Sequence, residues 1–298
     1  MTQTIRLGIS TCPNDTFAFH GLLTQAVDWR GLRFEVELLD IEQLNERLAR
    51  GDFDVCKTSF HAALSMVDDI VVLPSGSALG FGVGPLLLSA SPNTAPQGPD
   101  QLTLCPGRQT TAALLFALFH PGTTRVEHTV FSEIMPRLRA GEAQFGVCIH
   151  EGRFTWQQQG LGLVEDLGTR WETETQCPLP LGGIVASRRL SVDTIATVQR
   201  VIHDSLTYAL SHRDAPLPTM RAHAQELDDR VLMQHVDLYV NEWTLDLGPL
   251  GTRALDELSA RAAAAGLGTG GRLQVFADRV RARLIGWCDF SGGSATLE

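Results

Sequence analysis

The feature that most constrains the fold is an internal repeat, in which two stretches about ninety residues apart carry the same landmarks in the same order. In the first stretch, an apolar run precedes Cys12-Pro13, and a later helix-like segment ends at Gly51. In the second, an apolar run precedes Cys105-Pro106, and a helix-like segment ends at Gly141. The offsets, 93 and 90 residues, are nearly equal. Because a repeat sets the architecture before finer features do, the sequence predicts two similar lobes that present strand-to-helix loops to a shared cleft.

Each stretch alternates short apolar runs with helix-like segments, which is typical of parallel βαβ units. In the first stretch, strands are expected at 5–9, 32–38 and 55–57, with helices at 16–26, 41–49 and 59–66. In the second stretch, strands are expected at 102–104, 125–130 and 145–149, with helices at 111–119 and 133–139. Four helices are expected nearer the C-terminus, at 192–211, 218–226, 229–239 and 250–265.

Two segments are expected to carry the chain between the lobes. The region 86–99 ends in a Pro- and Ser-containing linker, and 178–186 ends in an apolar strand, 184–186. This pattern predicts an α/β, two-lobed, type II periplasmic-binding-protein-like fold with a cleft between the lobes and a helical C-terminal segment. Residues 1–93 and 187–298 are expected to form lobe 1, and residues 94–186 to form lobe 2.

The composition excludes several classes of partner and of site. A net charge of −10 disfavours a nucleic-acid backbone or an anionic membrane as partner, and no stretch approaches the roughly 20 apolar residues of a spanning helix. The N-terminal segment lacks the basic and apolar regions of a secretory signal, so we expect a cytoplasmic protein. None of the cysteines forms a C-x-x-C pair, so we expect reduced thiols and neither a disulfide framework nor a zinc site. The six cysteines are Cys12, Cys56, Cys105, Cys148, Cys177 and Cys288.

Lys57 is the first candidate for ligand contact, because it is the only lysine and lies at the carboxyl end of a predicted parallel strand. In open α/β sheets, ligands bind at that edge. Thr58 and Ser59 follow it, which places hydroxyls and backbone N–H groups at the start of a predicted helix. The alternatives are an incidental lysine and ordinary helix capping. Thr110 and Thr111 occupy the corresponding turn of the second lobe, where one is expected to cap the helix and the other to face the cleft.

His150 is the candidate general base, since it follows the strand of the second lobe that corresponds to the strand ending near Lys57. A histidine titrates near neutral pH, as a general base must. The sequence leaves open whether Glu151, Arg153 or Asp15 tunes it, and a turn or N-cap role is favoured for Asn14 and Asp15. The other eight histidines, His61 among them, are expected to be structural or exposed. No metal or cofactor motif is present, because the glycines of 80–84 lack the dinucleotide-binding spacing.

Several of these motifs, taken in order, resemble the 1,4-dihydroxy-6-naphthoate synthase family of the futalosine route to menaquinone. The resemblance runs from about residue 5 to about 247. It rests on the segments 12–17, 57–59, 80–85, 107–112, 150–154 and 241–246.

The resemblance implies a cofactor-independent carbon–carbon lyase. It would convert cyclic de-hypoxanthine futalosine into 1,4-dihydroxy-6-naphthoate and dihydroxyacetone. It also implies that His150 is the base, and that Lys57–Ser59 with Thr110 and Thr111 contact a small carboxylate substrate.

Three other functions remain open at this point. A solute-binding protein of the same fold would need only the cleft, but the absent signal peptide and a histidine at the cleft edge count against it. A sensor domain of a transcription regulator is disfavoured by the acidic charge and by the lack of a preceding helix-turn-helix. Chorismate dehydratase, which is related in fold and pathway, is the closest alternative, because a fold does not determine a function. The oligomeric state is not predicted.

Overall fold

A computed structural model describes residues 2–149, 152–224 and 228–277. The helices and strands follow one another along the chain as β1 Thr4–Ser10, α1 Pro13–Ala18, α2 His20–Leu23, β2 Arg33–Leu39, α3 Ile41–Ala49, β3 Val55–Ser59, α4 Phe60–Ala63, β4 Ile70–Val72, β5 Ala78–Gly80, β6 Leu86–Ser89, β7 Leu102–Pro106, α5 Thr111–Phe119, β8 Arg125–Thr129, α6 Phe131–Arg139, β9 Phe145–Cys148, α7 Gly152–Thr155, the 3₁₀ turn Trp156–Gln159, β10 Gly162–Asp166, α8 Leu167–Thr175, β11 Leu179–Ser187, α9 Val192–Ser211, α10 Leu217–His223, α11 Asp229–Tyr239, α12 Glu242–Leu245 and α13 Gly248–Ala264.

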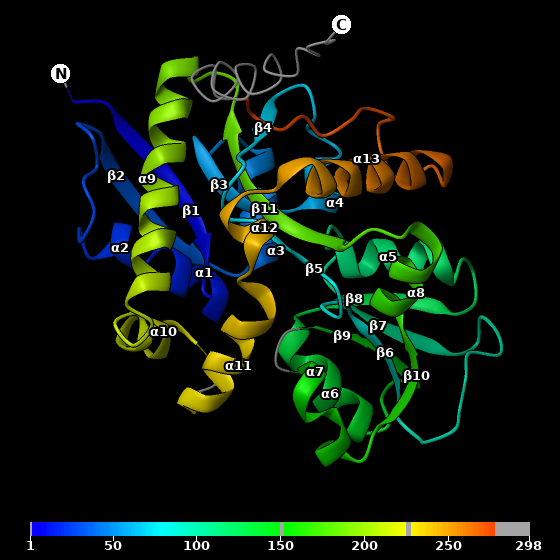
Figure 1. Cartoon of the computed structure of the whole chain (residues 1–298). Coiled ribbons are helices and arrows are strands. Elements are labelled where there is room, and N and C mark those ends of the chain that lie inside the picture. Colours follow the sequence, from blue (N-terminus) through cyan, green and yellow to red (C-terminus); the bar gives the residue numbers. More distant parts are fainter. Residues whose placement is uncertain (1, 150–151, 225–227, 278–298) are drawn as a thin grey trace, which may run out of the picture.

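Two mixed sheets form the two lobes (Figure 1). The first has the order β2-β1-β3-β11-β4, with β5 also paired to β11, and the second has the order β10-β6-β9-β7-β8. In each sheet three neighbouring strands are parallel: β2, β1 and β3 in the first sheet, and β9, β7 and β8 in the second. The strand beside β3 or β9, which is β11 or β6, is antiparallel and follows a crossing between lobes. The predicted two-lobed α/β fold is therefore confirmed, and the strand expected at 184–186 is the second half of β11.

The repeat extends to individual ion pairs. In lobe 1, Arg47 Nη1 lies 2.6 Å from Glu37 Oε2, and Arg47 Nε lies 3.0 Å from Asp52 Oδ2. In lobe 2, Arg137 Nη1 lies 2.7 Å from Glu127 Oε1, and Arg137 Nε lies 3.0 Å from Glu142 Oε2. The three members of each group are separated by the same 90 residues. The arginine of each group lies in a helix, α3 or α6, whose C-cap is followed by a glycine with positive φ. The φ is 79° at Gly51 and 73° at Gly141, a backbone conformation that glycine adopts without strain.

The pairing of the two Cys-Pro dipeptides is wrong, although the repeat itself is real. Cys12 is the N-cap of α1, whereas Cys105 lies inside strand β7. Strand pairing places Gly8 beside Glu37 in lobe 1 and Leu104 beside Glu127 in lobe 2, so the offset between first strands is 96 residues rather than 93. Lobe 1 has the longer connection after its first strand, and this connection contains both α1 and α2.

The chain crosses between lobes at 81–85 and again at 176–178. The strand β6, at 86–89, belongs to the second sheet, and β11 belongs to the first. The linker at 91–99, expected at a crossing, instead follows β6 inside lobe 2. At the first crossing Gly84 lies against Gly168, where an added Cβ would come within 2.2 Å of the Gly168 Cα. The crossing thus depends on a close approach of two backbones that only glycine allows.

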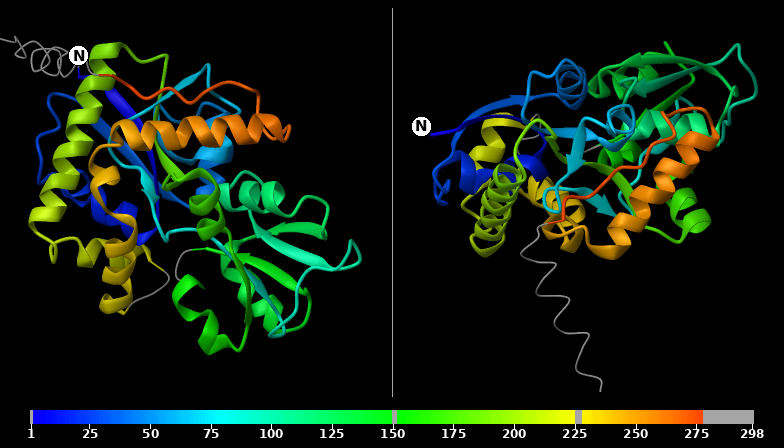
Figure 2. Two further views of the ribbon diagram at one scale, coloured as in Figure 1. Left: turned by 45° about the vertical axis from the view of Figure 1, so that its right-hand side comes forward. Right: turned by 90° about the horizontal axis from the view of Figure 1, so that it is seen from above.

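Helices cover both faces of the first sheet (Figure 2). Side chains alternate between the two faces of a strand, so one face of β1 carries Ile5, Leu7 and Ile9. These three residues pack in one apolar cluster with α1, α2 and α9. The opposite face packs on α3, α4 and α13, with Leu44 and Leu258 in the shared core. Helices α9 and α13 therefore pack on opposite faces of the first sheet, and residues 274–276 extend along the edge strand β4.

The expected helices and strands differ from the observed ones in both lobes. The helices at 41–49, 111–119, 192–211 and 229–239 have the expected bounds. The helix expected at 16–26 is instead two short helices separated at Phe19, and that expected at 59–66 is the single turn α4. Strands β4 and β10 and the helices α7, α8 and α12 were not predicted. Within the described residues, no helix has the length and apolar character needed to cross a membrane.

Candidate functional site

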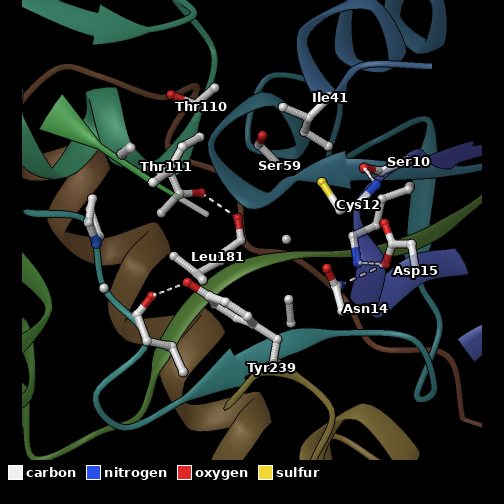
Figure 3. Close-up of a pocket in the computed structure, with 18 of the residues that line it drawn as sticks. Ser10, Cys12, Asn14, Asp15, Ile41, Ser59, Thr110, Thr111, Leu181 and Tyr239 are labelled. Atoms are coloured by element: carbon white, nitrogen blue, oxygen red, sulfur yellow. Dashed lines mark hydrogen bonds and ion pairs between the residues drawn. The ribbon is translucent and has the colours of Figure 1, made fainter. Parts of the chain in front are cut away.

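A pocket lies where the two lobes meet, and it contains about 680 Å³ of space that is partly open to solvent (Figure 3). Lobe 1 lines it with the loop after β1 and the end of β3, and lobe 2 with the start of α5 and the end of β9. Helix α11 and the crossing segments complete the wall. The lining residues are Ser10, Cys12, Asn14, Asp15, Ile41, Lys57, Ser59, Ala78, Val83, Gly84, Pro85, Thr110, Thr111, Ala112, Ile149, Leu181, Gly182, His235 and Tyr239.

Lys57 lines this pocket, but its ammonium group is engaged by the protein. Lys57 Nζ lies 2.7 Å from Asp15 Oδ1 and also donates to the carbonyl of Gly76 at 3.1 Å. Both side chains of the ion pair are almost completely buried, at 6% and 4% exposure. Because Asp15 neutralises it, Lys57 does not present an isolated positive charge to a ligand. The turn or N-cap role favoured for Asp15 is wrong, since its carboxylate is the partner of Lys57.

Thr58 and Ser59 have different positions because side chains alternate along β3. Ser59 lines the pocket, whereas Thr58 is fully buried and does not. Asn45 of α3 holds both residues. Its Oδ1 accepts from the Thr58 hydroxyl and from the Ser59 N–H, each at 2.9 Å, and its Nδ2 donates to Ser59 Oγ at 3.2 Å.

The two candidate threonines of the second lobe, Thr110 and Thr111, line the pocket from the amino end of α5. Thr110 is the N-cap, and its Oγ1 accepts from the N–H of Ala113 at 3.2 Å. The Thr111 hydroxyl donates to the carbonyl of Leu181 at 2.6 Å, as the dashed line in Figure 3 shows. The expectation that one threonine caps the helix is confirmed. The other bonds to Leu181 of β11, so it connects lobe 2 to lobe 1.

The predicted base, His150, and its neighbour Glu151 lie outside the described residues. Ile149, which precedes them, lines the pocket from lobe 2. Arg153 is turned to structural partners, since it pairs with Asp166 at 2.7 Å and donates to the carbonyl of Gly84. Arg153 therefore ties α7 to the first crossing.

His235 was not among the predicted site residues, and Asn14 was expected only to form a turn or an N-cap. His235 Nε2 bonds to Asn14 Oδ1 at 3.1 Å, and Asn14 Nδ2 donates to Asp15 Oδ1 at 3.0 Å. A polar chain therefore runs from α11 through α1 to Lys57. One signal was available: His235 occupies the buried stripe of α11 together with Leu232, Val236 and Tyr239, a spacing at which a polar side chain is unusual.

Burial controls the titration of the other groups around the cleft. It lowers the pKa of His61, although that ring bonds to the carbonyl of Thr110 at 3.1 Å, and His61 is a packing residue as expected. Burial also raises the pKa of the Cys105 and Cys148 thiols to about 12, so both are inert at neutral pH. No disulfide joins two of the cysteines in the described part of the chain. No group of three or more potential metal ligands occurs among the residues with described placement.

Comparisons with known proteins agree with this architecture. Residues 5–264 match the model of a family described as menaquinone biosynthesis. A 1,4-dihydroxy-6-naphthoate synthase of Thermus thermophilus is 43% identical over 265 residues, which cover 89% of this chain and 96% of the relative. The synthase of Streptomyces coelicolor is 38% identical over 270 residues, with 89% and 95% covered.

Solved structures of related shape include a protein from Archaeoglobus fulgidus, with a TM-score of 0.84 and 29% identity over 89% of this chain and 98% of that one. A ligand-binding component of an ABC-type import system from Staphylococcus aureus has a TM-score of 0.67 at 15% identity, covering 92% and 96%. An alkanesulfonate-binding protein from Xanthomonas axonopodis pv. citri, bound to MOPS, has a TM-score of 0.65 at 13% identity, covering 91% and 96%. The last two likenesses show the fold alone, and they confirm its periplasmic-binding-protein-like class.

Proposed function

Because the chain belongs to the menaquinone-biosynthesis enzyme family, we propose that it is a carbon–carbon lyase that converts cyclic de-hypoxanthine futalosine into 1,4-dihydroxy-6-naphthoate and dihydroxyacetone. One observation carries the proposal: a pocket between the lobes is lined by predicted ligand residues from both of them, Lys57 and Ser59 on one side and Thr110 and Thr111 on the other. Such a pocket encloses a small molecule when the lobes close.

The lining suits an aromatic carboxylate. Ile41, Val83 and Leu181 offer apolar surface for a fused ring, and the Tyr239 ring lies against the same space (Figure 3). Hydroxyl groups stand at the ends of β3 and at the start of α5, where the helix dipole favours negative charge. We place the substrate carboxylate between Ser59 and the Thr110–Thr111 pair. Lys57 then acts as half of a neutral pair with Asp15, which holds the loop after β1 rather than binding the carboxylate alone.

We propose His150 as the general base. It follows Ile149, which lines the pocket, and it stands in a segment that resembles the synthase family. A neutral imidazole removes a proton from the substrate, the carbon–carbon bond breaks, and the remaining skeleton becomes aromatic, which supplies the driving force. Closure of the lobes excludes water and aligns the base with its proton. No added cofactor is required by this route, because the substrate contains all atoms of the two products.

The test is product formation by purified protein, treated with a chelator, given cyclic de-hypoxanthine futalosine. We expect dihydroxynaphthoate from the wild type, and a loss of more than about a hundredfold in kcat for His150→Ala with substrate binding retained. Normal turnover by His150→Ala would show that His150 is not the general base. Chorismate is offered to the protein in parallel, and its conversion would favour the chorismate dehydratase alternative. Tight binding of cyclic de-hypoxanthine futalosine without turnover would instead indicate a binding protein.

A further inference from the structure

Glu42 joins the two lobes beside the pocket without lining it. It lies near the start of α3 in lobe 1, and its Oε1 accepts the backbone N–H of Arg108 at 2.8 Å and that of Gln109 at 3.4 Å. These amides belong to the turn of lobe 2 that leads into the N-cap of α5. Hydrogen bonds from amides to a carboxylate are stronger than those between neutral groups. Glu42 therefore supplies lobe 2 with a negative charge close to the positive end of a helix dipole.

The turn is shaped to receive this carboxylate. Gly107 has a φ of 85°, and a Cβ at that position would lie 2.6 Å from Glu42 Oε2. A side chain there would both strain the backbone and expel the carboxylate. A second cavity, lined by Glu42, Gly107, Arg108 and His128, adjoins this contact. The contact thus joins the two lobes and is not part of any of the hydrophobic clusters.

Glu42 is also connected to the pocket through Asn45. Asn45 Nδ2 lies 3.4 Å from Glu42 Oε2 and 3.2 Å from Ser59 Oγ. The orientation of this amide is set by its oxygen, which accepts from the Ser59 N–H and the Thr58 hydroxyl. Ser59 Oγ accepts a hydrogen bond from Asn45, and no described residue accepts the hydrogen of the Ser59 hydroxyl. This hydroxyl can therefore donate to a ligand.

We propose that Glu42 is a positioning residue that couples closure of the lobes to the orientation of the Ser59 hydroxyl. With the lobes closed, Glu42 holds the 107–109 turn of lobe 2 and, through Asn45, the hydroxyl of lobe 1. With the lobes open, the carboxylate loses both amide donors, and the two halves of the carboxylate site separate. The role of Ser59 in this coupling rests on the proposed function, whereas the contact between lobes does not.

The closing experiment compares Glu42→Ala and Glu42→Gln with Glu46→Ala, which removes the same charge one turn later on an exposed part of α3. Amide hydrogen exchange, resolved to single residues by NMR, is measured on the ligand-free protein. We expect the Arg108 and Gln109 amides to exchange at least about tenfold faster in Glu42→Ala than in the wild type or Glu46→Ala. Unchanged protection of these amides in Glu42→Ala would overturn the proposal.

Kinetics supply the second readout. Loss of the contact reduces the closed population, which weakens binding while leaving saturated turnover largely intact. We expect Glu42→Ala to raise KM for the futalosine substrate, and Kd for 1,4-dihydroxy-6-naphthoate, by about tenfold, with kcat lowered less than about threefold. Glu42→Gln keeps an acceptor oxygen and restores most of the affinity.

A purely structural role would lower the melting temperature of Glu42→Ala and leave KM unchanged, and that result would refute the coupling. If the wild type made no naphthoate, the proposed function would fail, while amide exchange would still decide whether Glu42 joins the lobes.

Discussion

The two lobes share one framework but present different chemistry at the same edge. Lobe 1 ends β3 with Lys57 and Ser59, and the residues 90 positions later, at the end of β9, are Val147 and Ile149. Helix α3 faces its strand with the buried amide of Asn45, where α6 carries Met135. The ion-pair groups around Arg47 and Arg137, in contrast, are alike in both lobes.

This difference shows that the repeat determines the framework of each lobe but not the side chains that line the cleft. The parts that are alike stabilise strand-to-helix packing, which each lobe needs separately. The parts that differ surround the cleft. Lobe 1 supplies a buried polar network together with the apolar side chains of Ile41 and Leu181, and lobe 2 supplies Ile149 and the start of α5. A ligand with both a polar and an apolar part suits such a mixed lining.

The largest expected effect tests the buried pair of Lys57 and Asp15 in lobe 1. Asp15→Ala leaves the Lys57 ammonium buried without its carboxylate, and should lower the free energy of unfolding by about 3–5 kcal/mol. The double variant Asp15→Leu with Lys57→Met removes both charges and should recover most of this loss. Urea unfolding measures the free energy of unfolding of each variant. A double variant as unstable as Asp15→Ala would show that the pair is not the cause.

The next effect compares equivalent positions of the two lobes. Asn45→Leu removes the partner of the Ser59 N–H and the Thr58 hydroxyl, so it should cost about 2–4 kcal/mol. Met135→Leu, at the corresponding position of α6, exchanges one apolar side chain for another and should cost less than about 1.5 kcal/mol. Equal losses in urea unfolding would mean that the polar network of lobe 1 contributes no special stability.

A smaller effect concerns pH and the contact between lobes at His61. Burial lowers the pKa of His61, so the folded protein favours its neutral form. In the unfolded chain this histidine has its ordinary pKa of 6.5. The contribution of neutral His61 to the free energy of unfolding is therefore fully present above pH 6.5 and is lost as the pH falls below it. We expect the melting temperature to fall between pH 7.5 and 5.5, and to fall less steeply in His61→Gln. Identical slopes would exclude His61 as a contributor.

The smallest effect tests the part of the framework that is alike. Arg47→Ala and Arg137→Ala each remove a surface group of ion pairs, which contributes little because water screens it. We expect small losses of similar size in the two lobes, both below that of Asn45→Leu, when melting temperatures are compared. A large loss in one lobe only would mean that the two groups are not equivalent despite their matching geometry.

The sequence by itself determined the two-lobed architecture, because periodicity and glycine helix ends are local signals. The helices at 41–49 and 111–119 followed from such signals, as did the pocket positions of Lys57, Ser59, Thr110 and Thr111 at the edge of parallel strands. Strand β10 and helix α8 were missed, since their segment carries no strong periodic pattern.

Only the tertiary structure decided what these side chains contact. That Lys57 is neutralised by Asp15, that His235 reaches Asn14 from 221 residues away, and that Glu42 bonds across the cleft all depend on distances between segments remote in the chain. Local sequence patterns specify which face of an element is buried. They do not specify which polar group meets another inside the fold, because that choice is made by packing of the whole molecule.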